Sequence, residues 1–553
     1  MRNIDPTTLA VIRGALEQIA DEMDTVLSTS AFSPVISDAW DRASGIFHPQ
    51  TGEVIVQGHT GLPIFIIVMQ HTVQEVLKDH PPESMKPGDV FIVNDPYRGG
   101  THTMDVKFVR PYFRDGELMA LLANTGHWPD VGSITFGGFT TTATDIYQEG
   151  FRMPPVKIYD GGVYNEILAE VMFYNMRVAN DRRGDMAAQL NSLAMGAKRL
   201  DEFFDRFDGD TVFACVDELK NRSEALMRER IAEIPDGTYQ FSDTMDSDGV
   251  DEGELTLDVK MIVKGTNITF DLSGSSPECR GPFNSPYSNT VTGTMIAVKH
   301  VFWDVPINSG CFEPFEWIIP EGTMLNPRPP RSVSGTTTET CNMIVSTTLG
   351  ALAQAVPGRV PAGFFATGSN ICLGGTSDTY GEYASLLLVG GGMGGNPDGD
   401  GLNNGTPAIG GSRNGSIEIT EQSVPFLFTK YGLRENSAGD GEYRGGLGVE
   451  VALQLREGES YLTFLGDRFD VGPYGLAGGE SGGTADHVFH TGGEYFQAPH
   501  RSKIDSLYLK PGDGMVVRTP GGGGYGDPAK RAPEARADDM RRGYFGPPAQ
   551  AAE

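Results

Sequence analysis

Two polar segments of this chain flank one predicted β-hairpin, and this arrangement limits how the N-terminal part can fold. The polar segments are residues 94–105 and 124–132. Asp115-Gly116 lies between them and is typical of the two-residue turns that close hairpins. The runs on either side of this turn, 106–112 and 118–123, predict two antiparallel strands. The polar segments should therefore meet at the open end of the hairpin.

The expected register brings two imidazoles and a carboxylate together. If the turn has only two residues, His127 lies opposite Met104, within a residue or two of His102 and Asp105. Imidazole nitrogen and carboxylate oxygen suit zinc, manganese or iron. Aspartate and histidine are also common in ordinary turns, so a purely structural loop is the alternative. The pattern makes His102, Asp105 and His127 candidate metal ligands.

The charge balance excludes some classes of partner. The chain has 553 residues and a formal net charge of −30 at pH 7. A surface this acidic repels the phosphates of nucleic acids and the headgroups of anionic membranes. The length predicts two to four structural units, or one large interlocked domain. The 39% share of hydrophobic residues is enough for a sizeable core.

The sequence indicates a cytoplasmic protein. Its apolar runs are shorter than the roughly 20 residues that span a bilayer, and residues 1–5 lead straight into an amphipathic helix without a signal-peptide pattern. The cysteines are widely spaced and form no CxxC pair, which predicts buried, inert thiols and neither a disulfide framework nor a thiolate zinc site. They are Cys215, Cys279, Cys311, Cys341 and Cys372.

Hydrophobic patterning predicts an α+β protein with several mostly antiparallel sheets and packed helices. The predicted regions are an N-terminal metal-site region at 1–235, a central α+β region at 236–388, a C-terminal glycine-rich β region at 389–530 and a flexible tail at 531–553. Helices are expected from Pro6 onward and at 69–78, 166–205, 210–230, 291–302 and 340–356. The clearest later strands are expected at 255–263, 268–272, 447–455 and 461–465.

Two glycine runs resemble phosphate-binding loops in composition alone. They are residues 390–395 and 521–524. Neither run carries the Lys-Ser/Thr pair of a P-loop or opens a clear helix. We interpret both as backbone-packing turns, where glycine tolerates positive φ. The sequence therefore predicts no nucleotide site in this chain.

Long motifs give the chain a resemblance to a known family. The first is Asn-Asp-Pro-Tyr-x-Gly-Gly-Thr-His-x-x-Asp at 94–105, and the second is residues 123–132. Further motifs lie at 148–155, 184–189, 320–327, 444–448 and 519–528. On these motifs the chain resembles the hydantoinase B family over roughly residues 4–530. That family includes the B subunits of ATP-dependent N-methylhydantoinases and caprolactamases, the matching half of 5-oxoprolinases, and subunits of acetone and acetophenone carboxylases.

The resemblance implies a metal site with four ligands. His102, Asp105 and His127 match the family pattern, and Asp41 aligns with an aspartate in the relatives' Glu-Arg-x-Asp-Phe-Ser segment. This chain departs from that segment on both sides of Asp41, which leaves Asp38 as a rival. Zinc is the first choice of metal, with manganese or iron as alternatives.

Three further polar residues are candidate catalytic groups. Asp130 either makes an Asx turn, or orients an imidazole or acts as a base on a metal-bound water. Glu149 and Arg152 lie in the motif at 148–155. The arginine either binds a phosphorylated intermediate or forms a loop salt bridge.

The chain also differs from many members of the family. Around Pro63 many relatives carry His-x-Pro-x-His, where this chain has Gly61 and Phe65. Trp128 occupies a position where many relatives have another histidine. We therefore expect a more apolar pocket wall, and the identity of the substrate is left open.

The family chemistry implies a reaction divided between two subunits. A hydantoinase A-type ATPase subunit with ATP and Mg²⁺ would phosphorylate the carbonyl oxygen of a cyclic amide. This chain would then present a metal-bound water that opens the hydantoin or lactam ring. The implied assembly is a dimer of heterodimers. One alternative is a subunit of a ketone carboxylase of the acetophenone or acetone type, whose metal stabilises an enolate; another is a non-catalytic scaffold subunit.

Overall fold

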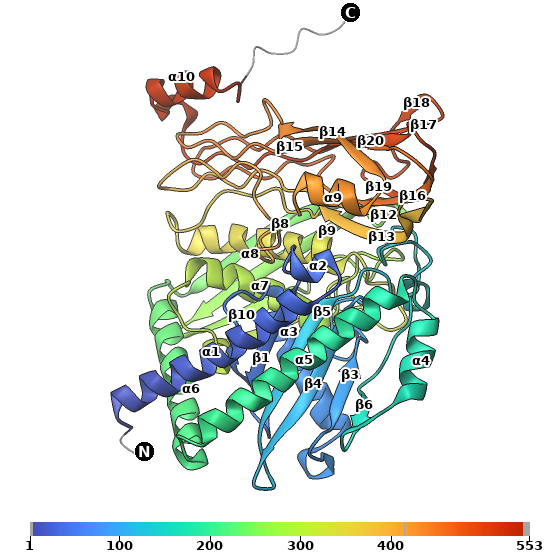
Figure 1. Cartoon of the computed structure of the whole chain (residues 1–553). Helices are drawn as coiled ribbons and strands as arrows, with labels where there is room; N and C mark the ends of the chain where they lie inside the picture. Colours follow the sequence, from blue (N-terminus) through green and yellow to red (C-terminus); the bar gives the residue numbers. More distant parts are fainter. Residues whose placement is uncertain (1–3, 414, 546–553) are drawn as a thin grey trace, which may run out of the picture.

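The structure is a computed structural model that describes residues 4–413 and 415–545. Its layers are stacked along the long axis of the molecule, with the N-terminal sheet and helices at one end and the C-terminal strands at the other (Figure 1). The described residues form four sheets, in which almost all neighbouring strands are antiparallel and only β10 and β11 pair in parallel. This architecture confirms the predicted α+β class.

The first sheet contains the predicted hairpin at its centre. Its seven strands have the order β2-β1-β5-β4-β3-β6-β7. They are β1 (Arg42–Phe47), β2 (Val54–Gln57), β3 (Val90–Val93), β4 (Asp105–Arg114), β5 (Glu117–His127), β6 (Val156–Asp160) and β7 (Val163–Tyr164). Asp115 and Gly116 form the turn between β4 and β5, with φ angles of 51° and 89°. Two left-handed residues are what this type of hairpin turn requires.

The register of the hairpin differs from the expected one. A β-bulge between Tyr112 and Phe113 shifts the pairing by one residue. His127 therefore pairs with Asp105, and the expected pairing with Met104 is wrong. The shift places two candidate ligands directly opposite each other.

Helices of the N-terminal region pack around this sheet. They are α1 (Pro6–Ser30), α2 (Pro34–Ser37), α3 (Ile64–Asp79), α4 (Glu166–Tyr174), α5 (Ala179–Phe204) and α6 (Gly209–Ala232). Of these, the long helices α1, α3 and α5 make the main contacts with its strands. α1 begins where the Asp5 side chain accepts a hydrogen bond from Thr8 N at 2.9 Å. The single helix expected at 166–205 is wrong. The structure has two helices there, because α4 ends at Tyr174 and Val178, just before α5, adopts a left-handed φ of 51°.

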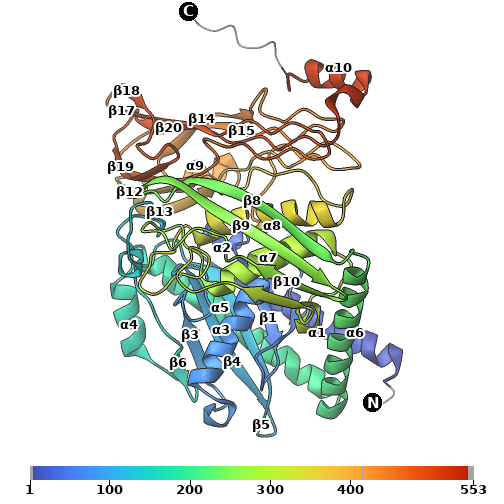
Figure 2. The ribbon, with the colours of Figure 1, turned by 180° about the vertical axis from the view of Figure 1, so that it is seen from behind.

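The central layer pairs a four-stranded sheet with two buried helices (Figure 2). The strands, in the order β11-β10-β9-β8, are β8 (Gly237–Ser247), β9 (Glu252–Lys264), β10 (Asn267–Asp271) and β11 (Phe315–Ile318). The helices α7 (Tyr287–Val301) and α8 (Cys341–Ala355) pack against each other. A π-helical turn, Thr336–Thr340, leads directly into α8. Such turns are rare and occur frequently at functional sites.

Two sheets form the C-terminal end, with the orders β13-β12-β16-β19 and β14-β15-β20-β17-β18. Their strands are β12 (Asn370–Ser377), β13 (Gly381–Leu388), β14 (Phe426–Leu433), β15 (Val449–Leu455), β16 (Glu459–Leu465), β17 (Asp486–Thr491), β18 (Glu494–Phe496), β19 (Lys503–Leu509) and β20 (Gly514–Arg518), and a short helix, α9 (Ile417–Ser423), precedes β14. The two glycine runs lie side by side, and Gly395 N donates to Gly523 O at 2.9 Å. A Cβ on Gly522 would meet Met393 O at 2.0 Å, which supports the interpretation of backbone packing.

The predicted flexible tail contains a helix, α10 (Pro533–Arg541). Arg531 anchors it, because its guanidinium lies 2.6 Å from Asp539 and 2.7 Å from Asp400. The expectation of a loose tail is therefore wrong for these residues, since an ion-pair network fixes them. Residues 546–553 of the predicted tail lie outside the described residues.

The hydrophobic cores cross the expected regional boundaries. One core cluster runs from Leu9 to Leu465 and joins the N-terminal and central layers. A second, smaller cluster lies between the C-terminal sheets. β12 and β13, which fall in the predicted central region, pair with C-terminal strands. The division into regions stays a prediction.

The structure also bears on the expectations about thiols and membranes. All five cysteines are free and buried, as expected. Within the described part of the chain, no helix combines the length and the apolar character needed to cross a membrane.

Candidate metal centre

The predicted ligands converge where the strands of the hairpin end. Asp105 and His127 are paired residues of β4 and β5, and His102 lies in the turn that leads into β4. Ligand atoms of these three buried residues all lie within 4.8 Å of one another. Asp41 precedes β1, and its Oδ2 lies 3.7 Å from His127 Nδ1. The rival Asp38 lines a neighbouring cavity instead, so Asp41 is the aspartate that the structure places beside the other three candidates.

The spacing of the ligand atoms fits a divalent ion. Two ligands that each lie about 2.1 Å from a tetrahedral ion are about 3.4 Å apart. His102 Nδ1 lies 3.4 Å from Asp105 Oδ2, which matches this spacing. His127 Nδ1 instead shares a 3.3 Å hydrogen bond with Asp105 Oδ1, so its Nε2 is the nitrogen available to an ion. Among the described residues, neither His102 Nδ1 nor His127 Nε2 has a hydrogen-bond partner, although both atoms are buried. Since buried polar atoms are normally satisfied, these nitrogens and the donor set fit a metal ion.

Burial and mutual charge set the protonation of the cluster. Burial lowers the pKa of His102 to about 3, so its ring is neutral, as a ligand must be. Burial raises the pKa of Asp105, but His102 and the hydrogen bond with His127 outweigh it and hold that pKa below its usual range. Burial also opposes a charged His127, yet the same hydrogen bond and Asp41 raise its pKa. Burial is the main cause that raises the pKa of Asp41 to about 7.

Neighbouring polar groups fix the position of Asp105. The Thr101 hydroxyl donates to Asp105 Oδ2, and Lys107 Nζ donates to the Asp105 carbonyl at 3.0 Å. Burial lowers the pKa of Lys107 to about 8. Asn94 Nδ2 donates to Thr103 O at 2.7 Å and so holds the loop that carries His102. Lys107 is absent from the residues predicted for the site, although the two-residue period of a strand places it on the same face as Asp105.

Two predicted catalytic residues, Asp130 and Arg152, form ion pairs with other residues. Asp130 Oδ2 lies 2.9 Å from Arg177 Nη1, and Asp130 Oδ1 accepts from Gly132 N at 2.8 Å in an Asx turn. Arg152 Nε lies 3.6 Å from Asp95 Oδ2. These contacts agree with the structural alternatives of a turn and a loop salt bridge. The catalytic roles of both residues stay predictions.

Glu149, the third candidate, is buried and supports the segment before the π-helical turn. Its Oε1 accepts hydrogen bonds from Val333 N at 2.7 Å, Ser334 N at 2.6 Å and the Ser332 hydroxyl. Burial raises its pKa to about 7. The geometry gives Glu149 a positioning role, and its catalytic role stays a prediction.

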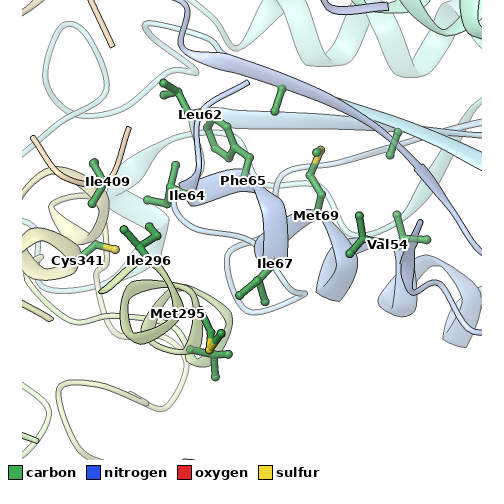
Figure 3. Close-up of a cluster of buried hydrophobic side chains, with 14 of the residues drawn as sticks. Val54, Leu62, Ile64, Phe65, Ile67, Met69, Met295, Ile296, Cys341 and Ile409 are labelled. Atoms are coloured by element: carbon green, nitrogen blue, oxygen red, sulfur yellow. The ribbon is translucent and has the colours of Figure 1, made fainter. Parts of the chain in front are cut away.

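A cavity of about 30 Å³ adjoins the ligand cluster. A space of this size holds an ion and one or two waters. Its apolar wall consists of Leu62, Ile64, Phe65, Phe139, Leu386, Leu388 and Ile409. Figure 3 shows four of these side chains: Leu62, Ile64 and Phe65 from one stretch of the chain, and Ile409 from a stretch far away in the sequence. Phe65 lies in this wall, in agreement with the expected apolar pocket.

Apart from the four proposed ligands, the rest of the lining consists of three residues with hydroxyl side chains. Thr337 and Thr338 come from the π-helical turn, and Ser412 follows the C-terminal strand β13 by more than twenty residues. The sequence does not predict them, because more than 200 residues separate them from the hairpin and no spacing pattern links the two segments.

The fold and the site define a chain that brings histidine and aspartate side chains together in a buried cluster at the open end of a central hairpin. A family model described as hydantoinase B/oxoprolinase matches residues 5–528. The chain belongs to this family.

Two curated relatives match nearly the whole chain. The B subunit of a putative D-/L-hydantoinase of Pseudomonas sp. (strain NS671) is 31% identical over 99% of this chain and 94% of its own length. The beta subunit of the caprolactamase of Pseudomonas jessenii is also 31% identical, over 98% of this chain and 94% of its own length. Both relatives are named as subunits of larger enzymes.

Two solved structures share the fold. A chain of the ATP-dependent caprolactamase from P. jessenii superposes with a TM-score of 0.90, at 29% identity, over 99% of this chain and 95% of that chain. A nucleotide-free acetone carboxylase structure gives a TM-score of 0.88 at 19% identity, over 98% of this chain and 78% of that chain. The second likeness concerns the fold alone.

Proposed function

We propose that this chain is the B subunit of an ATP-dependent cyclic amide hydrolase and opens a hydantoin or lactam ring that a partner subunit has activated. One observation carries the proposal: His102, Asp105 and His127 converge beside Asp41 at a small cavity, with imidazole nitrogens that lack partners among the described residues. Membership of the family and the names of the two Pseudomonas relatives support the same activity.

The residues that would hold the metal are Asp41, His102, Asp105 and His127. Zinc suits this mixed nitrogen and oxygen set best, and manganese or iron would also fit it. When bound, such an ion lowers the pKa of water from about 15.7 to about 7 and so supplies a nucleophile at neutral pH.

The chain's own residues would prepare the site in three ways. The buried, neutral His102 ring keeps a lone pair for the ion. Asp105 holds the ring of His127 by a 3.3 Å contact while Thr101 and Lys107 hold Asp105. The apolar wall limits the water near the reacting carbonyl to what a cavity of about 30 Å³ admits.

Activation of the amide is assigned to a hydantoinase A-type ATPase subunit with ATP and Mg²⁺. A phosphorylated amide oxygen turns an unreactive carbonyl into an electrophile with phosphate as its leaving group. The glycine runs of this chain pack backbone to backbone, as Gly392 N shows by donating to Pro520 O at 3.0 Å, and this supports an ATP site in the partner. The assembly we infer is a dimer of heterodimers.

The test compares two histidine variants of the chain in complex with its A-type partner. We expect His102→Ala to lose bound metal and ring opening while ATP hydrolysis by the complex persists. His59→Ala is the matched control, because His59 is exposed and pairs with Asp21 at 3.0 Å; it should keep both metal and activity. Full ring opening by a metal-free His102→Ala complex would overturn the proposal.

The likeness in fold to acetone carboxylase supports a second candidate, a subunit of a ketone carboxylase. Labelled bicarbonate separates the two activities, because only the carboxylase incorporates the carbon into its product. A scaffold role would leave the purified chain without stoichiometric metal. Metal that is present and lost in His127→Ala would eliminate the scaffold role.

A further inference from the structure

Apart from the proposed ligands, the side chains that line the metal-site cavity are apolar or carry neutral hydroxyl groups. Seven of the fourteen residues that line it are aliphatic or aromatic, and apart from the four proposed ligands its polar members are Thr337, Thr338 and Ser412. Among the described residues that line the cavity, none is a lysine or an arginine. A ring carbon that points away from the reacting carbonyl would therefore meet hydrocarbon.

A charged substituent on the ring would have no partner in such a wall. Moving a carboxylate out of water without a cation or hydrogen-bond donors is unfavourable, whereas a hydrocarbon ring gains from burial. Leu62, Ile64 and Phe65 occupy one stretch of the wall, and Ile64 N donates to Ile409 O at 3.1 Å across it. Figure 3 shows Ile64 and Ile409 next to each other in this cluster.

Thr338 is a polar lining residue whose hydroxyl is held in place by a neighbour. Its Oγ1 accepts a hydrogen bond from Asn370 Nδ2 at 2.6 Å, which fixes the hydroxyl and leaves its proton free to be donated. Thr338 is 7% exposed and lines the cavity, so the hydroxyl is held at the site with little water around it. The π-helical turn presents this residue and Thr337 side by side.

We propose that this site selects cyclic amides whose ring carries hydrocarbon and no charged group, and that the Thr338 hydroxyl binds the amide's polar edge. The inference rests on the proposed ring-opening function and names the substrate class for it. The phosphoryl group of an activated amide would sit on the carbonyl oxygen beside the ion, so it does not need a cation in the apolar wall.

A cavity of about 30 Å³ is smaller than a lactam ring, so binding of the ring would require apolar side chains over the ligand cluster to shift. Leu386 lines both the small cavity and an adjoining cavity of about 350 Å³, so it forms part of the wall between them. Its neighbour Leu387 lines the larger cavity only. This difference between adjacent residues of β13 supplies a matched pair of variants.

The first experiment compares 2-pyrrolidinone with 5-oxoproline, which are the same lactam without and with a carboxylate. The complex with the A-type partner is assayed for ring opening and for ATP hydrolysis. We expect kcat/KM for 2-pyrrolidinone to exceed that for 5-oxoproline by at least a hundredfold. Equal values, or a preference for 5-oxoproline, would overturn the inference while leaving the hydrolase function intact. If the complex opens no cyclic amide at all, the proposed function and the inference both fail.

The second experiment places a cation in the wall of this chain. Leu386→Arg should shift the preference toward 5-oxoproline at least tenfold, because a guanidinium would pair with the carboxylate. Leu387→Arg should leave the preference unchanged. A folded Leu386→Arg complex with the wild-type preference would contradict the assignment, as would an equal shift in Leu387→Arg.

The third experiment tests Thr338 on the neutral lactam. Thr338→Val should raise KM about tenfold with a smaller change in kcat, since it removes one hydrogen bond, and Thr338→Ser should restore KM. Thr347→Val is the control, because the Thr347 hydroxyl donates to Met343 O at 2.7 Å within α8. An unchanged KM in Thr338→Val, or no recovery in Thr338→Ser, would refute the role of the hydroxyl.

Discussion

Glu149 offers a sharp test of how the site is held in place. Its carboxyl is fully buried, and a single oxygen accepts hydrogen bonds from Val333 N, Ser334 N and the Ser332 hydroxyl. The segment it binds leads directly into the π-helical turn that lines the metal cavity. We therefore expect Glu149 to act through the position of this turn.

The size of the effect follows from the partners that are lost. Glu149→Ala leaves two buried backbone N–H groups without an acceptor, and each costs about 1–3 kcal/mol, so the free energy of unfolding should fall by about 2–6 kcal/mol. Glu149→Gln keeps an oxygen acceptor in the same place. The glutamine variant should therefore stay within about 1 kcal/mol of the wild type at acidic pH.

The two side chains differ in how stability depends on pH. Burial raises the folded-state pKa of Glu149 from 4.5 to about 7. The folded protein then binds the proton more tightly than the unfolded chain, so this stabilisation is fully present below pH 4.5 and is lost as pH rises to 7. Between pH 5.5 and 8 the wild type should lose about 2 kcal/mol relative to Glu149→Gln. Tyr97 lies near Glu149, but burial raises the pKa of Tyr97 above its usual value, so Tyr97 does not titrate between pH 5.5 and 8.

Denaturant unfolding is followed by tryptophan fluorescence at pH 5.5 and pH 8 for the wild type and for Glu149→Gln. The quantity measured is how much more the free energy of unfolding falls with pH in the wild type than in the variant. If Glu149→Gln loses stability with pH as steeply as the wild type, Glu149 is not the group responsible. Ring-opening assays of the complex add a second criterion. A Glu149→Gln complex that is stable but inactive would assign the carboxyl a catalytic role and would refute the positioning argument.

Three further predictions concern the hairpin end and its surroundings. Chelation of metal should lower the melting temperature of the wild type, and added zinc should restore it, because a ligand that binds only the folded state stabilises that state; His127→Ala should show neither change. Trp128→Phe should cost about 1–3 kcal/mol in urea unfolding, since it leaves Gln189 Oε1, now 2.8 Å from the indole nitrogen, without its donor. Gly132→Ala should greatly reduce soluble protein, because a Cβ there would lie 2.0 Å from Asn175 O at a φ of 87°.

Local patterns in the sequence predict much of the N-terminal fold. The Asp115-Gly116 turn identifies the hairpin, and the capping Asp5 marks the start of α1. The bulge beside Phe113 has no comparable local signal, since it depends on how β4 meets its neighbours in the sheet. The sequence does not predict the interruption between α4 and α5 at Val178, because a β-branched residue seldom adopts a left-handed φ.

The metal ligands and the cavity wall differ in how far sequence can predict them. Three ligand candidates lie within one hairpin, so turn chemistry and strand pairing are enough to bring His102, Asp105 and His127 together. The wall combines segments near residues 62–65, 337–338, 386–388 and 409–412, whose proximity depends on the stacking of three layers. No periodicity along the chain encodes that proximity, which is why Thr338 emerges only from the structure.

Different kinds of contact hold the ligand cluster and the cavity wall in place. Backbone pairing of the strands and hydrogen bonds from Thr101 and Lys107 hold the ligand cluster in position. A substitution of one of the candidate ligands therefore disturbs a buried network of charges. The wall is held mainly by apolar contacts, in which exchanges of similar volume cost little. Under the proposed function, residues such as Phe65 and Leu386 would change the chemistry that faces the ring and leave the ligand cluster as it is. Selectivity for the ring and the capacity to open it would then be carried by separate parts of the chain.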